Sequence, residues 1–287
     1  MGFDTAYDAI TEENGDQRWA FGTGFADPLD GVDTTVPDGV AGADLAAYCL
    51  MLGDDALIMS HRLQEWLARA PELEEETALA NIALDLLGQA RLLLTRAGHA
   101  DGTGRTEDDF AFGRGAAEFR NVRLAEITDT DFGGLIARLL VFSAWRLALL
   151  DRLRESADPV LAAIAARGVQ ELTYHRDYAA QWLLRLAGGT DYSRARMAAG
   201  LEAAAPLTAE LFADSELELR LGSGVAPRPA ELRAEFDTVL AAVLGRAGLP
   251  WPDVDARPAA RGEHTDRIGP LVAELQSVAR AYPGATW

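Results

Sequence analysis

The sequence predicts an all-α fold. Apolar residues recur at steps of three and four along several long segments, which is the spacing of an amphipathic helix. Glycine, proline or acidic residues separate these segments, and an alternating strand pattern is not evident. With 287 residues, 49% of them hydrophobic, the chain is long enough to bury a sizeable core in one large or two small domains.

The start of the chain differs in composition from the rest. Residues 1–43 are acidic and rich in Gly and Pro, with no sustained apolar period, so we expect a flexible or loosely docked extension. Residues 44–287 are then a single helical domain. The extension lacks the basic and apolar regions of a secretory signal. The single cysteine, Cys49, lies among apolar residues, which favours a reducing, cytoplasmic compartment.

The chain is strongly acidic, with 45 acidic against 26 basic residues and a net charge of −19. This charge opposes binding to nucleic acid. No apolar run approaches the length that spans a bilayer, so we expect no membrane segment. Every basic residue is an arginine, and we expect one group of them to form a solvated helix face with ion pairs: Arg138, Arg146, Arg152 and Arg154.

Local signals delimit the first two helices. Asp44 is a suitable N-cap and begins the first apolar stripe. Pro71 interrupts the pattern, and the acidic residues 72–76 suit the positive end of a second helix dipole. The second helix ends near Gly98, and residues 98–130 form a long connection.

Further helices follow this connection. A third carries an apolar stripe over residues 136–150, and a fourth begins at Asp158-Pro159 and ends at Gly188-Gly189. The remaining helices are predicted at about 191–213, 229–247 and 270–282.

Two segments of the chain echo each other. DLLGQ at 85–89 and ELTYH at 171–175 both read acid-Leu-x-x-polar, and each lies in the second helix of a hairpin that ends on a glycine. Two helix pairs joined by one long crossover are the topology of the ferritin-like bundle. The sequence therefore predicts a ferritin-like four-helix bundle with additional C-terminal helices.

A ferritin-like bundle can hold a di-iron site, in which two helices each supply a carboxylate and the other two each supply Glu-x-x-His. The inward positions of the apolar stripes fall on six residues: Ala56, Leu86, Gln89, Ser143, Leu172 and His175. Only one of the six is an imidazole, and the others are poor ligands or none. The sequence therefore predicts no catalytic, cofactor or metal site in this chain.

Some residues near these positions remain candidates for metal binding. In ELTYHRDY, Glu171 lies four residues before His175, and Asp85 has the same relation to Gln89, with Asp55 near the first ligand position. These groups are either ligands in a shifted register or, as we favour, a Glu171–His175 hydrogen bond within one helix. We also expect Gln89 and His175 to hydrogen-bond to each other in the core without a metal.

The other histidines, His61, His99 and His264, are expected at the surface or at helix ends, with His264 starting the last helix. Other active-site motifs are absent from the sequence. A phosphate-binding loop, a dinucleotide fingerprint and a Gly-x-Ser-x-Gly elbow do not occur.

Three segments resemble a known family. HRLQEWLARAPELEEETALANIALDLLGQAR at 61–91, ELTYHRDYAAQWLLRLAGGTD at 171–191 and GEHTDRIGPLVAELQSVARAYPGATW at 262–287 are similar to the non-catalytic, ferritin-like C subunits of bacterial phenylacetyl-CoA epoxidase complexes. The resemblance runs from about Asp44 to Trp287. It implies a structural subunit of a multicomponent monooxygenase in aerobic phenylacetate breakdown.

The resemblance also implies partners. A related ferritin-like subunit would carry the di-iron centre and the catalysis, and a reductase and small accessory subunits would complete a hetero-oligomer. The chain alone would bind no cofactor and could form a homodimer. Two alternatives stay open: the chain is itself a metal-binding oxygenase, or it is a module that binds a CoA thioester.

Overall fold

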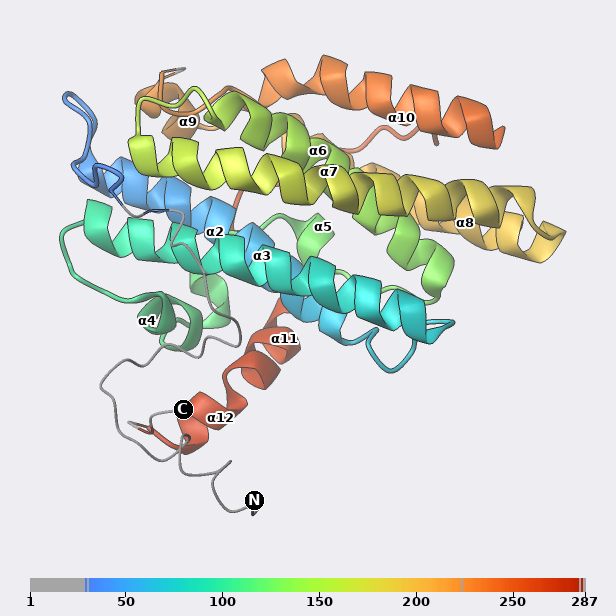
Figure 1. The fold of residues 1–287 in the computed structure, drawn as a ribbon, viewed down its shortest axis with the longest axis horizontal. Coiled ribbons are helices and arrows are strands. Elements are labelled where there is room, and N and C mark those ends of the chain that lie inside the picture. The colour runs from blue at the N-terminus through green and yellow to red at the C-terminus, as the bar shows by residue number, and fades with distance from the viewer. Residues whose placement is uncertain (1–28, 30, 223, 284, 286–287) are drawn as a thin grey trace, which may run out of the picture.

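The computed structural model describes residues 29, 31–222, 224–283 and 285. Throughout these residues the regular structure is helical, without a strand. Figure 1 shows long helices lying along one another, with shorter helices at one side and below. The predicted all-α fold is confirmed.

Four long helices form the bundle. The first pairs with the second and the third with the fourth, which gives two hairpins. The crossover between the hairpins contains three short helices, α4 (Glu107–Phe112), η2 (Ala116–Glu118) and α5 (Arg123–Glu126). This order is the ferritin-like topology. The long helices are α2 (Gly42–Gln64), α3 (Leu73–Ala100), α6 (Phe132–Leu153) and α7 (Pro159–Gly188).

Side-chain caps fix where the second hairpin begins. The Asp131 carboxylate accepts a hydrogen bond from the Gly134 amide at 3.0 Å and caps α6. Asp158 caps α7 in the same way, with Pro159 at the first helical position, as the sequence predicts. Asp44, in contrast, is not the cap of α2: the helix begins two residues earlier, and Asp44 forms an ion pair with Arg220 at 2.8 Å.

The C-terminal part adds several shorter helices beside the bundle. The predicted helix at 191–213 is divided, because Pro206 lies at the start of a 3-10 turn that follows α8. The sequence did not predict α9. The added elements are α8 (Asp191–Ala204), η3 (Ala205–Phe212), α9 (Glu216–Leu221), η4 (Pro229–Leu232), α10 (Arg233–Ala247), α11 (Ile268–Leu275) and α12 (Ser277–Ala281).

Helix α6 lies in the centre of the fold. Contrary to the sequence prediction, α3 and α6 are both long and apolar enough to cross a membrane by length and composition alone. In α6, 94% of the qualifying window is buried inside the protein. Its apolar character is that of a core helix, which is hydrophobic on every side.

The chain before α2 is docked where the structure describes it. Val32, Val36 and Val40 pack against the core, and the buried Arg96 donates a hydrogen bond to the Thr34 carbonyl. The last part of the predicted flexible extension is therefore held against the bundle. Residues 1–28 and 30, the rest of that prediction, lie outside the described residues.

Candidate functional site

The predicted ligand positions converge on the interior of the bundle. Each of them is at most 3% exposed. Ser143 donates its hydroxyl hydrogen to the Leu139 carbonyl at 2.6 Å, one turn back along α6. Leu86 and Leu172 belong to the hydrophobic core, as does Ala56. Four of the six positions are therefore filled by packing groups or by a hydroxyl bonded to its own helix.

The polar residues of α3 and α7 pair across the two helices. The Gln89 amide donates to the Glu171 carboxylate at 2.9 Å, and the His175 ring lies 3.0 Å from the Asp85 carboxylate through Nε2. The predicted Gln89–His175 bond and the predicted Glu171–His175 bond are therefore both wrong. The helices run antiparallel, so a step forward on α3 meets a step back on α7, and 89 faces 171 while 85 faces 175.

His175 has the orientation of a metal-binding histidine. Because a carboxylate only accepts, Nε2 carries the proton and donates it to Asp85. Nδ1 is then bare and, within the part of the chain that the structure describes, has no hydrogen-bond partner. Metal-ligating histidines have this arrangement, with the second nitrogen donating to a carboxylate. Asp85 thus orients the ring.

The largest correction to the sequence prediction concerns the arginines of α6. Arg138 and Arg146, expected on a solvated face, are 1% and 0% exposed. Arg138 forms an ion pair with Asp129. The Arg146 Nε donates to the Gln89 side-chain carbonyl at 3.0 Å, and its two terminal nitrogens contact no acceptor among the described residues. Burial lowers the pKa of Arg146 to about 10, so the group remains charged at neutral pH.

A second buried carboxylate lies near this arginine. Asp55, at 0% exposure, accepts from the Val122 amide and from the Arg261 guanidinium, both at 2.7 Å. Arg261 comes from a loop more than 200 residues further along the chain. Sequence reasoning singled out Asp55 but missed Arg261, because no local pattern connects them.

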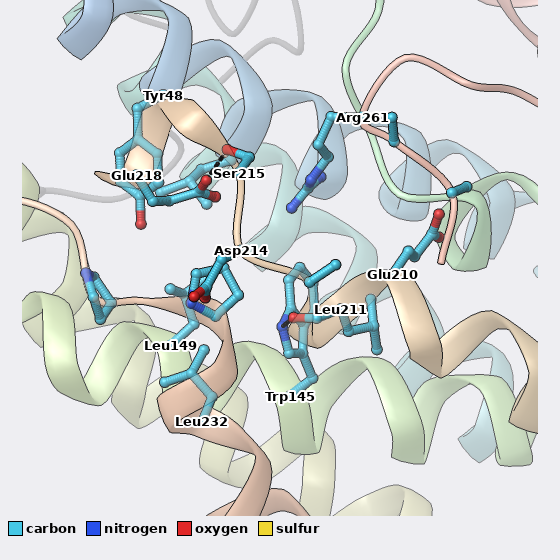
Figure 2. A pocket seen from close by; sticks show the side chains of 16 residues that line it. Tyr48, Trp145, Leu149, Glu210, Leu211, Asp214, Ser215, Glu218, Leu232 and Arg261 are labelled. Atoms are coloured by element: carbon cyan, nitrogen blue, oxygen red, sulfur yellow. Dashed lines mark hydrogen bonds between the residues drawn. The ribbon is translucent and has the colours of Figure 1, made fainter. Parts of the chain in front are cut away.

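Arg261 also lines a small cavity of about 240 Å³ (Figure 2). Trp145, Leu149 and Leu211 line it as well. Its other labelled side chains include three carboxylates, Glu210, Asp214 and Glu218. Burial raises the pKa of the Glu210 carboxyl. The cavity is smaller than ordinary ligand pockets, and its acids oppose phosphate groups, so it does not suit a CoA thioester.

The C-terminal segment is fastened to the crossover. His264 lies 2.9 Å from both the Glu126 carboxylate and the Phe119 carbonyl, one through each ring nitrogen. The Gln276 amide donates to two backbone carbonyls, of Ala111 and Arg114. His264 is thus an anchoring residue in the loop before α11, not the first residue of a helix. His61 is partly buried and His99 exposed.

The residues present do not fit a di-iron centre. A group of three or more His, Cys, Asp or Glu side chains able to hold a metal is not found in the described ranges. His175 offers one bare nitrogen, while Glu171 is bonded to Gln89 and to Arg167. One imidazole and one amide cannot hold two irons.

The fold and this site together define a class: a ferritin-like bundle whose ligand positions hold mostly non-ligands. The chain belongs to the family described as phenylacetic acid catabolic protein, whose profile matches residues 33–287. It is 43% identical over 246 residues to the C subunit of the 1,2-phenylacetyl-CoA epoxidase of Escherichia coli (strain K12), across 85% of this chain and 99% of that protein. The resemblance seen in the sequence is confirmed, and the match begins before residue 44.

Proposed function

We propose that this chain is a structural, non-catalytic subunit of a multicomponent monooxygenase that epoxidises the ring of phenylacetyl-CoA. It pairs with a di-iron catalytic subunit of the same fold in the cytoplasm, and a reductase and small accessory subunits complete the hetero-oligomer. The relative's name, which makes it one subunit of 1,2-phenylacetyl-CoA epoxidase, supports the assignment to this reaction.

The observation that carries the non-catalytic role is the filling of the bundle centre. Ala56, Leu86, Ser143 and Leu172 leave no ligand where a di-iron bundle has carboxylates, and the bundle is otherwise complete. Buried charged ligands are costly without their metal. Apolar residues at these positions make the bundle a stable scaffold that needs no metal to fold.

Co-expression with the catalytic subunit tests this proposal. A tag on this chain is expected to retain the catalytic subunit through purification, with iron on that subunit and not on this chain. Omitting this chain is expected to abolish epoxidation of phenylacetyl-CoA by the remaining components. Full epoxidation without it, together with no co-purification, would reject the structural role.

One observation favours a second function, metal binding by this chain itself. His175 has a bare Nδ1 and an orienting carboxylate, with Glu171 on the same helix. Elemental analysis of the chain expressed alone in iron-rich medium decides between the two functions. About one or two metal ions per chain would establish a metal site, whereas less than a few hundredths would exclude it.

A further inference from the structure

One cation lies among the polar groups at the centre of the bundle. Arg146 extends from α6, three residues after Ser143, and its Nε donates to Gln89 of α3 at 3.0 Å. Gln89 in turn donates to Glu171 of α7 at 2.9 Å. Asp55 of α2 and Glu171 are near enough to stabilise the charged guanidinium against its burial. Groups from all four helices of the bundle therefore surround this single guanidinium.

We infer that the Arg146 guanidinium supplies the positive charge that metal ions supply at the centre of a di-iron bundle. It is a fixed cation that belongs to the chain itself. It compensates the inward carboxylates that remain, Asp55 and Glu171, which are at 0% and 14% side-chain exposure. The bundle then folds without metal and retains charged residues near its centre.

The orientation of Gln89 agrees with this role. Its carbonyl oxygen accepts from Arg146 and its amide nitrogen donates to Glu171. A glutamine can satisfy a donor on one side and an acceptor on the other in one orientation only. Gln89 thus transmits the interaction between the cation on α6 and the carboxylate on α7.

Other arginines do not duplicate the charge at this point. Arg261 is bonded to Asp55 and to the Arg120 carbonyl at the far side of that carboxylate. Arg167 approaches Glu171 from the outer side of α7, where its side chain is 42% exposed. Arg146 is the fully buried cation between the two carboxylates.

Comparison of two variants of the full chain tests the inference. Arg146→Lys keeps a positive charge, and Arg146→Met replaces it with an apolar chain of similar length. If the charge is required, Arg146→Met lowers the melting temperature by about 6–12 °C, because two buried carboxylates lose their cation, and Arg146→Lys lowers it clearly less. The same pair at Arg152, which is 50% exposed on the same helix, is the control and shows no such difference.

A charge-removal variant makes the result decisive. Combining Arg146→Met with Glu171→Gln removes one carboxylate together with the cation, and recovers about 2–4 °C of the loss. If Arg146→Met is too unstable to purify, recovery of soluble protein in the double variant or in Arg146→Lys carries the same information.

The opposite ranking would overturn the inference. Arg146 would be a packing residue if Arg146→Met equalled or exceeded Arg146→Lys in stability, or if neither Arg146→Lys nor the double variant restored what Arg146→Met loses. These measurements use the isolated chain. Their failure is therefore distinct from a failed pull-down with the catalytic subunit.

Discussion

Two polar regions of this molecule differ in how they satisfy their buried groups. The central layer, formed by Asp85, Gln89, Arg146, Glu171 and His175, contains nitrogens without a partner among the described residues. The C-terminal clamp, formed by His264 and Gln276 with the crossover, connects each ring nitrogen of His264 and the Gln276 amide to an acceptor.

The difference separates two uses of buried polarity. The clamp fastens distant parts of the chain, so its hydrogen bonds are specific and complete. The central layer lies where related bundles hold metal, and its polar groups surround a cation instead. Buried polar atoms without partners are costly, so they persist where function or history outweighs stability. Substitutions in the two regions should therefore have different consequences.

The largest effect is expected from a carboxylate at an emptied position. Leu172→Glu places a charge in the core at 0% exposure, and we expect a loss of about 3–5 kcal/mol in the free energy of unfolding. Urea denaturation at neutral pH measures it.

Leu172→Met conserves volume and is the matched control, with a loss below about 1.5 kcal/mol. If Leu172→Glu were tolerated without added metal, the central layer would be more polar and better hydrated than its packing indicates.

Local signals and distant contacts were not equally predictable. Asp158-Pro159 and Gly188 marked the ends of α7, because capping and helix termination depend on neighbouring residues. The inward positions followed from helix period. The partners did not, since the pairing of 89 with 171 depends on the register between two helices.

Arg146 and the clamp show what remained out of reach. Arg146 lies on the face of Ser143, and a helix that is apolar on every side should be buried, so its burial could have been predicted. His264 and Glu126 are 138 residues apart, and neither lies in a pattern that points to the other. Only the folded chain brings them together.

The clamp is expected to respond to pH. Both His264 nitrogens face acceptors, and the hydrogen bond to Glu126 is the main cause that raises the His264 pKa above its ordinary value. Although burial opposes ionisation, hydrogen bonds from His264 and Thr265 hold the Glu126 pKa below its usual range. A raised histidine pKa stabilises the fold fully below the unfolded value of about 6.5 and no longer does so once the pH passes the folded value.

His264→Gln should therefore cost about 1.5–3 kcal/mol at pH 6 and less at pH 9. Urea denaturation at the two pH values measures the difference, with His99→Gln on the exposed surface as the control. A cost that does not change with pH would mean that His264 is neutral in the clamp.

In the central layer, His175→Ala should cost about 1–3 kcal/mol, since it removes the ring that Asp85 orients and leaves a small cavity. Epoxidation by the assembled complex should persist, because His175 is not expected to bind metal. Thermal unfolding of the isolated chain and turnover of the complex are the two measurements. Lost turnover with an intact complex would assign His175 a catalytic part and erase the contrast with the clamp.

The smallest effect concerns the outer side of the central layer. Gly88 is exposed on α3, one residue before Gln89, and an added Cβ would meet no atom within 4 Å. Gly88→Ala should stabilise the isolated chain by about 0.5–1 kcal/mol through helix propensity. Gly245→Ala on α10, equally open, is the control and should gain a similar amount. If only Gly88→Ala weakens retention of the catalytic subunit, the α3 face beside the central layer is where the partner packs, and the emptied site lies beneath the interface.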